Sequence, residues 1–176
     1  ISIDRDANAL AHAGERLARF GERVTLVKSN FDDIAGILDS LGIGGVDGML
    51  FDLGVSSPQL DDAARGFSYM EDAPLDMRMD PSAPLTAREV VNDWSEQELR
   101  RILRDYGEER YAAKIAAGII KRRAKAPVET TLELVDIIRS AMPAAALREK
   151  QHPAKRSFQA IRIAVNDELG SIERML

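Results

Sequence analysis

The residues best suited to chemistry lie in one short segment, Asp52-Leu53-Gly54-Val55-Ser56-Ser57-Pro58-Gln59. A carboxylate ends an apolar run, and two hydroxyls and an amide follow it at fixed spacing. Gly54 would let the backbone approach a ligand closely, because it has no side chain. Pro58 would stiffen the loop, since its ring fixes one backbone angle. The segment therefore has the composition of a rigid polar site beside a strand end.

A loop of this kind suits the methylation of an exocyclic amine on a nucleic-acid base. Such an amine is a poor nucleophile because its lone pair is delocalised into the ring. Carboxylate, hydroxyl and carbonyl acceptors that hold its protons let the nitrogen pyramidalise toward a methyl donor. We therefore expect catalytic roles for Asp52, Ser56, Ser57 and Pro58, and assign no general base. The alternative is a polar junction between a strand and a loop that performs no chemistry.

Nucleophilic and metal-dependent chemistry finds little support. The chain has no cysteine, and its only histidines are His12 and His152, so neither a thiolate metal site nor a nucleophilic triad is expected. Gly54-Val55-Ser56-Ser57 also lacks the second glycine of a nucleophile elbow. We expect no bound metal.

Two further positions could bind a nucleotide cofactor. Asp4 follows the strand-like run Ile1–Ile3, and an acidic residue at the carboxyl end of a parallel strand binds ribose hydroxyls in Rossmann-like folds. Phe31 follows the next strand-like run, where it could contact an adenine ring while Asp32 or Asp33 accepts from its amino group. The alternatives are a helix N-cap or a solvated turn for Asp4, and a core position for Phe31.

Alternating strands and helices would position these residues. Strand-like runs cover 1–3, 24–27 and 46–53, and helical patterns cover 7–20 and 31–41. Apolar strands separated by helices indicate a parallel sheet of the α/β class. Because the sequence starts in a strand and stops inside a helical pattern, we expect a fragment that holds part of the sheet.

The second half of the sequence is predicted to be helical, after a loop-like stretch over 61–84. Three capping-box patterns announce helices, namely Thr86 with Glu89, Ser95 with Glu98, and Thr130 with Glu133. We predict helices over 86–92, 95–104, 108–124, 130–141 and 156–176. The last should carry an apolar stripe of Phe158, Ile161, Val165 and Leu169.

Charge is unevenly distributed in a chain whose net charge is −5. Residues 100–176 contain 16 basic and 10 acidic residues, so this segment permits RNA binding, although a solvated helical surface explains it equally well. The composition, 45% hydrophobic and 30% charged, is that of a globular protein. No apolar run is long enough to span a membrane and no signal peptide is visible, so we expect a cytoplasmic protein.

Several polar residues of the second half could face RNA. Asp76 and Arg78 either line a cleft or form a salt-bridged loop. A basic cluster, Lys121, Arg122, Arg123 and Lys125, either complements a helix dipole or contacts RNA. A polar stripe on the last helix and the residues before it could contact phosphates or base edges. These substrate-binding candidates are His152, Lys155, Arg156, Gln159, Arg162 and Asn166.

Beyond the individual residues, long ordered blocks of this sequence closely resemble the RsmH (MraW) family. The resemblance runs from Ile3 to about residue 170. Its most specific blocks are 51–61, Arg65-Gly66-Phe67-Ser68, Pro74-Leu75-Asp76-Met77-Arg78-Met79-Asp80, Tyr106-Gly107-Glu108-Glu109-Arg110, His152-Pro153 and Phe158-Gln159-Ala160-Ile161-Arg162.

This resemblance implies a Rossmann-like class I methyltransferase, with a partial sheet in this chain and an inserted all-helical domain. Residues 1–60 would belong to the methyltransferase domain, 61–155 to the insert, and 156–176 to a returning helix. The implied activity is N4-methylation of a cytidine in the decoding region of 16S ribosomal RNA with S-adenosyl-L-methionine. Asp4, Phe31, Asp52 and Gln59 would bind that cofactor. The implied partner is 16S ribosomal RNA or the small ribosomal subunit, with a homodimer as a candidate assembly.

The residues leave two other hypotheses open. One is a different nucleotide-dependent enzyme, such as a dehydrogenase, which Asp4 alone would fit. The other is a noncatalytic RNA-binding protein on a degenerate methyltransferase scaffold, since the family's glycine-rich motif is not in this sequence.

Overall fold

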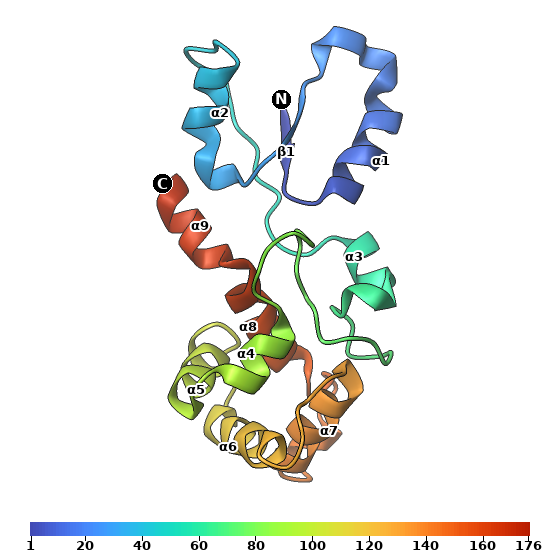
Figure 1. Ribbon diagram of the computed structural model, residues 1–176, viewed down its shortest axis with the longest axis vertical. Coiled ribbons are helices and arrows are strands. Elements are labelled where there is room, and N and C mark those ends of the chain that lie inside the picture. The colour runs from blue at the N-terminus through green and yellow to red at the C-terminus, as the bar shows by residue number, and fades with distance from the viewer. The chain divides into compact units, whose positions relative to one another are not determined.

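The computed structural model describes residues 1–176, which divide into two compact units (Figure 1). We name them the strand unit and the helical unit. The strand unit comprises Ile1–Gly54, Met79–Ser82 and Asp167–Leu176. The helical unit comprises Val55–Arg78 and Ala83–Asn166.

A parallel strand pair forms the centre of the strand unit, as the sequence predicts. Strand β1 (Ser2–Asp4) pairs with β2 (Leu26–Lys28), with Ile3 opposite Val27. Helix α1 (Ala7–Leu17) and the 3-10 turn η1 (Ala18–Arg23) connect them. Such a crossover through a helix is what a parallel pair requires. It brings the carboxyl ends of both strands to the same edge.

The segments that follow β2 are the 3-10 turn η2 (Phe31–Asp33) and helix α2 (Ile34–Ser40). Figure 1 shows α1 and α2 flanking the strand pair within this unit. Helix α9 (Glu168–Met175) packs against η2, where Arg174 Nη2 donates to Asp32 Oδ2 at 2.7 Å.

The prediction of a third strand over 46–53 is wrong for this structure. Residues 46–53 contain no strand and make no backbone–backbone hydrogen bond. Their apolar side chains lie at the surface, with Leu50 96% exposed. A run of apolar residues indicates that a segment tends to be buried. A strand also needs a partner strand that forms hydrogen bonds with its backbone. Neither β1 nor β2 pairs with this segment.

The helical unit contains most of the buried core. Five of its helices pack together, with α5 against α6 and α8, α6 against α7, and α4 against α8. Their fully buried side chains include Leu99, Ile102, Leu103, Ile115, Ile119, Leu134, Ile138 and Ile161. The elements are α3 (Ser57–Asp61), η3 (Ala63–Arg65), α4 (Ala87–Asp93), α5 (Glu96–Asp105), α6 (Ala112–Arg123), α7 (Thr131–Ala141), η4 (Ala146–Arg148) and α8 (Lys155–Asn166).

The capping patterns located the helix starts closely. Complete capping boxes begin α4 at Thr86 and α5 at Ser95. At α7 the box is half formed, because Thr130 accepts from Glu133 but the Glu133 carboxylate accepts from the backbone of Glu129 instead. No helix of the structure is long and apolar enough to cross a membrane.

Two helix boundaries differ from the prediction. Helix α6 begins at Ala112 rather than 108, because Glu108 has a left-handed backbone (φ 50°) that a helix cannot contain. The expected helix over 156–176 is two helices, because Asp167 is also left-handed (φ 47°, ψ 44°). The break removes Leu169 from the predicted apolar stripe, and its side chain is 40% exposed. The other stripe residues, Phe158, Ile161 and Val165, are buried.

Candidate functional site

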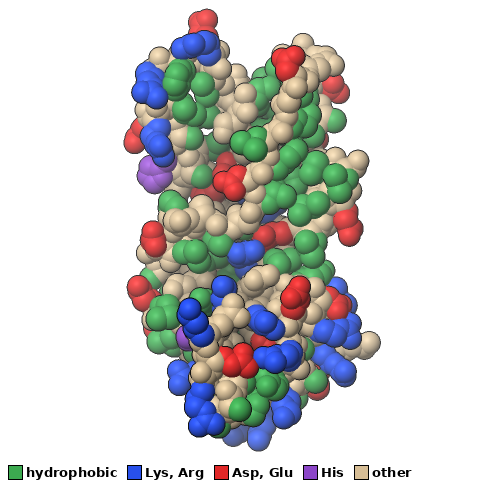
Figure 2. Space-filling model, turned by 180° about the vertical axis from the view of Figure 1, so that it is seen from behind, with side chains coloured by type: hydrophobic (Ala, Val, Ile, Leu, Met, Phe, Trp, Pro, Cys, Tyr) green, Lys and Arg blue, Asp and Glu red, His purple; other side chains and the backbone are tan.

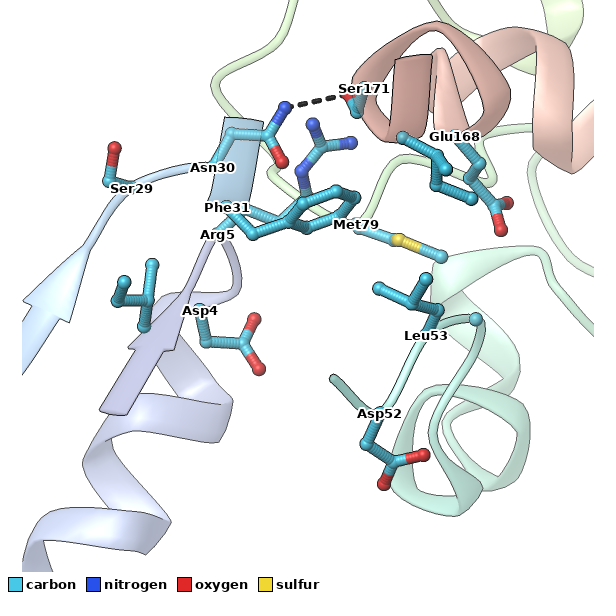
Figure 3. A pocket seen from close by; sticks show the side chains of 13 residues that line it. Asp4, Arg5, Ser29, Asn30, Phe31, Asp52, Leu53, Met79, Glu168 and Ser171 are labelled. Carbon is cyan, nitrogen blue, oxygen red and sulfur yellow. Dashed lines mark hydrogen bonds between the residues drawn. The ribbon is translucent and has the colours of Figure 1, made fainter. Parts of the chain in front are cut away.

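A pocket in the strand unit opens at the carboxyl ends of β1 and β2 (Figure 3). Its cavity measures about 120 Å³. Three of the four residues expected to bind a cofactor, Asp4, Phe31 and Asp52, line it, and the fourth, Gln59, lies in the helical unit. The remaining lining residues are Ile3, Arg5, Ser29, Asn30, Leu53, Gly54, Met79, Glu168, Ser171 and Ile172.

Asp4 is placed by the end of β1. Its Oδ1 accepts from the backbone N–H of Asp6 at 2.8 Å, and its Oδ2 has no partner. The N-cap of α1 is Asp6, which accepts from the Asn8 N–H at 3.0 Å, so Asp4 itself is not the cap. In Figure 3 the Asp4 carboxylate points into the open centre of the pocket. One carboxylate oxygen is therefore available to a ligand.

Phe31 forms one wall of the pocket. Its ring meets Phe51 edge to face, with centroids 6.2 Å apart and planes inclined by 72°. The ring is half-buried, so it is neither a core residue nor fully solvated. Asp32, one of two carboxylates considered for an adenine amine, is instead paired with Arg174.

Asp52 and Gly54 form the opposite wall. The Asp52 carboxylate is exposed and has no hydrogen-bond or ion-pair partner in the structure. Gly54 has φ +110°, a backbone conformation that other residues rarely adopt. This turn ends the extended segment and explains why a glycine follows the carboxylate so closely.

Sequence reasoning missed the pocket residues that come from distant segments. Met79 belongs to a short return of the chain, and Glu168 and Ser171 lie on α9. Ser171 Oγ accepts from Asn30 Nδ2 at 2.8 Å, which joins α9 to the end of β2 (Figure 3). No local pattern marks these residues, because they reach the pocket only through the tertiary fold.

The other half of the predicted loop begins a helix in the helical unit. Ser56 caps α3 by accepting from the Gln59 N–H at 3.4 Å, while Gln59 Oε1 accepts from the Ser56 N–H at 3.0 Å. Gln59 is buried, at 7% exposure. The spacing of Ser56 and Gln59 is itself a capping-box signature, which the sequence interpretation overlooked. Ser57 is exposed, its hydroxyl has no partner, and Pro58 follows it in the first turn.

Asp76 and Arg78 form the salt-bridged loop that was one of two interpretations. Arg78 Nη2 lies 2.7 Å from Asp76 Oδ2, and both side chains are about three-quarters buried. Burial alone would raise the pKa of Asp76, but the hydrogen bonds and charge of Arg78 outweigh it and hold the pKa below its ordinary value. The pair therefore remains ionised.

The polar stripe on α8 turns largely toward other backbone. Gln159 Nε2 donates to the Tyr106 carbonyl at 3.4 Å, and Arg156 Nη1 donates to the Glu108 carbonyl at 2.9 Å. Asn166 is buried, and its Nδ2 donates to the carbonyls of Met77 at 2.7 Å and Arg162 at 2.9 Å. All three side chains therefore bond within the helical unit, Asn166 from a buried position and Gln159 from an exposed one. Lys155 is exposed and has no partner.

His152 lies just before α8 and stacks on Tyr69, with ring centroids 4.5 Å apart and planes inclined by 12°. Its Nδ1 accepts from the Ala154 N–H at 3.2 Å. Burial lowers the pKa of His152, and the positive charge of Arg139 lowers it further. Both effects favour the neutral form of the imidazole.

The sequence pattern that defines the MraW methylase family matches residues 1–176. A ribosomal RNA small subunit methyltransferase H from Symbiobacterium thermophilum is 59% identical over 176 residues, covering 100% of this chain and 55% of that protein. The protein of the same name from Heliobacterium modesticaldum is 61% identical over 177 residues, covering 100% of this chain and 56% of its own. The protein of that name from Mycolicibacterium smegmatis is 61% identical over 172 residues, which cover 98% of this chain and 46% of the relative.

The chain thus spans about half the length of the curated relatives that it matches. The matched range, residues 1–176, is the whole of this chain. This chain belongs to the MraW methylase family.

Proposed function

We propose that the protein containing this chain transfers a methyl group from S-adenosyl-L-methionine to N4 of a cytidine in the decoding region of 16S ribosomal RNA. The observation that carries the proposal is the convergence of Asp4, Phe31 and Asp52 on one pocket at the carboxyl ends of parallel strands. Ligands of open α/β sheets bind at that edge. The names of the relatives, which are small subunit ribosomal RNA methyltransferases, support the substrate class. The strand unit would then be part of a class I methyltransferase domain that works in the cytoplasm, and the helical unit its insert.

The chemistry of the pocket fits the nucleoside part of this cofactor. Asp4 offers one unpartnered carboxylate oxygen to ribose hydroxyls, and the half-buried ring of Phe31 offers a flat apolar wall to adenine. A cavity of about 120 Å³ is smaller than the roughly 300–1,000 Å³ of most small-molecule sites. The pocket would therefore hold one part of the cofactor rather than the whole molecule.

The bound cofactor would supply an electrophilic methyl group on its sulfonium. The protein would supply acceptors for the protons of the cytidine amine, and the Asp52 carboxylate suits this role because nothing else in the structure occupies it. Ser57 and Pro58, exposed at the start of α3, would contact the substrate. Gln59 would act through Ser56, whose position its capping bond fixes. The target base must be unstacked to reach such a site.

The proposal is tested by single-turnover methyl transfer from labelled S-adenosyl-L-methionine to small ribosomal subunits, with the protein expressed at full length. Asp52→Ala should slow the transfer by roughly 100-fold or more, because it removes the acceptor for the amine proton. Asp47→Ala is the matched control: it is an exposed carboxylate in the same extended segment and does not line the pocket.

Three results would count against the proposal. Equal rates for Asp52→Ala and the unmodified protein would remove Asp52 from the mechanism. Methylation of another nucleotide would contradict the assigned target. RNA binding by the unmodified protein without any transfer would favour the noncatalytic scaffold.

A further inference from the structure

A groove runs between helices α6 and α7 of the helical unit, apart from the pocket described above. Its cavity measures about 660 Å³. Gly118 on α6 and Ile137 and Ala141 on α7 line it, and a Cβ added at Gly118 would lie 3.4 Å from Ile137 Cγ2 and 3.7 Å from Ala141 Cβ, which are ordinary contact distances.

One wall of the groove is a stripe of lysines. Lys114, Lys121 and Lys125 line it together with Gly118. Their spacing of four, three and four residues places all four positions on one face of α6 and its closing turn. The stripe extends about 16 Å along the helix axis at 1.5 Å per residue. All three lysines are exposed.

These three lysines have no partner within the protein, whereas Arg122 in the groove and several other arginines of the same unit are paired. Arg88 pairs with Glu129, Arg104 with Asp105, and Arg110 with Glu149. Arg122, inside the groove, donates to Glu133 Oε1 at 3.3 Å and to the Ala126 carbonyl at 2.7 Å. By contrast, Lys114, Lys121 and Lys125 make no hydrogen bond or ion pair. Their charges are therefore not balanced within the protein.

Stabilisation of the helix dipole does not explain the whole stripe. Lys121 lies in the last turn of α6 and Lys125 just beyond it, where cations are favourable. Lys114, however, is the third residue of α6, where a cation opposes the positive end of the dipole. A residue placed against the local electrostatics, on the same face as two other unpaired lysines, points to an external anion.

We propose that this groove binds the phosphate backbone of the RNA substrate, with Lys114, Lys121 and Lys125 each contacting phosphate. The inference rests on the proposed function, because it names where the same substrate is held. Figure 2 shows that most of the Lys and Arg side chains on the face drawn there lie over the helical unit. Phosphate contacts of this kind position a nucleic acid without reading its sequence. The groove would thus hold the RNA by its backbone rather than by its bases.

Two acidic side chains, Glu133 and Asp136, also line the groove, and one of them gives a further test of the proposal. Glu133 is neutralised by Arg122 and accepts from the Glu129 N–H at 2.7 Å. Asp136, on α7, is exposed and has no partner. Asp136 should repel a phosphate held by the lysines. Removal of the Asp136 charge should therefore strengthen RNA binding, whereas removal of a lysine should weaken it.

The test measures binding of a fluorescently labelled 16S ribosomal RNA transcript to the full-length protein, without cofactor, at several salt concentrations. Replacing all three lysines, Lys114→Gln, Lys121→Gln and Lys125→Gln, should lower affinity at least tenfold at low salt. The slope of log affinity against log salt should fall by about 2, because each phosphate contact contributes roughly 0.7–0.9. Asp136→Asn should raise affinity severalfold.

The matched control replaces three paired arginines of the same unit, Arg88→Gln, Arg104→Gln and Arg110→Gln, which removes the same total charge. A slope change equal to that of the lysine variant would overturn the proposal, because net charge alone would then explain it. An unchanged slope in the lysine variant would also overturn it, leaving a solvated face or an acidic protein partner.

Cofactor binding separates this inference from the proposed function. The lysine variant should bind S-adenosyl-L-methionine like the unmodified protein and transfer methyl groups at saturating RNA. If the lysine variant binds RNA normally, and neither it nor the unmodified protein transfers methyl groups, both proposals fail. If it loses RNA binding while the unmodified protein binds RNA but transfers nothing, the groove stands and the proposed function fails.

Discussion

Asp76 and Arg78 form a two-point ion pair within a single loop, with Nε 3.0 Å from Oδ1 and Nη2 2.7 Å from Oδ2. Further hydrogen bonds of these two residues join other parts of the loop. The backbone N–H of Arg78 donates to Asp76 Oδ1 at 2.9 Å, and Arg78 Nη1 donates to the Ala83 carbonyl at 2.7 Å. The Asp76 carbonyl in turn accepts from the Ala87 N–H at 2.7 Å. The pair thus connects this loop to the start of α4.

Arg78→Gln should lower the free energy of unfolding by about 2 kcal/mol, because a largely buried carboxylate loses its ion pair and the Ala83 carbonyl loses its donor. Urea denaturation of the full-length protein measures the change. Arg88→Gln serves as the control, since its pair with Glu129 has side chains that are 47% and 50% exposed and should matter less. Equal losses from the two variants would show that the loop does not depend on its ion pair.

The same pair makes stability depend on pH in a predictable direction. The folded pKa of Asp76 lies below its ordinary value of 3.8. The stabilisation is therefore complete above about pH 4 and is lost as the pH falls through the folded pKa. Asp76→Asn should make the free energy of unfolding lower at pH 7 and less steeply dependent on pH below 4. An unchanged acid dependence in this variant would contradict the assignment.

Asn166 should prove structural rather than RNA-binding. Asn166→Ala leaves the buried carbonyl of Met77 without its 2.7 Å donor, so the free energy of unfolding should fall by roughly 1–3 kcal/mol. Gln159→Ala removes only an exposed 3.4 Å contact and should cost far less. Thermal unfolding compares the two variants. A stable Asn166→Ala protein with weakened RNA binding would reverse this conclusion.

Ser56 offers a way to separate capping from catalysis. Ser56→Ala should destabilise α3 by about 1 kcal/mol, since it removes the acceptor for the Gln59 N–H. Ser56→Thr keeps the hydroxyl and should restore both stability and the methyl-transfer rate. If Thr restores stability but not the rate, Ser56 contacts the substrate directly, as the sequence first suggested.

Local signals in the sequence predicted the helices and the first two strands well. Capping boxes at Thr86 and Ser95 fixed two helix starts to the residue, because their side chains bond the backbone of the first turn. Asp4 and Phe31 line one pocket because each follows a strand of the parallel pair, whose carboxyl ends share one edge. Asp52 also lines it, although the strand predicted to end there does not form. Their role in cofactor binding stays a prediction.

The sequence-based predictions fail at positions whose conformation or location depends on tertiary contacts. The run over 46–53 is apolar enough for a strand, yet it lacks a bonded neighbour in this structure. Asp167 breaks the last helix through a left-handed backbone, which aspartate adopts more readily than most residues but which the helical pattern around it does not signal. Met79, Glu168 and Ser171 reach the pocket from far along the chain, and only the fold brings them there.

The central claim is that Asp4, with Phe31 and Asp52, forms part of a site for S-adenosyl-L-methionine. Isothermal titration of the full-length protein tests it most directly, with S-adenosyl-L-methionine and NAD as ligands and Asp4→Ala as the variant. We expect the unmodified protein to bind S-adenosyl-L-methionine and not NAD. Asp4→Ala should bind it at least tenfold more weakly, because the ribose hydroxyls lose a charged acceptor. Binding of NAD in its place, or equal affinity in the variant, would contradict the account.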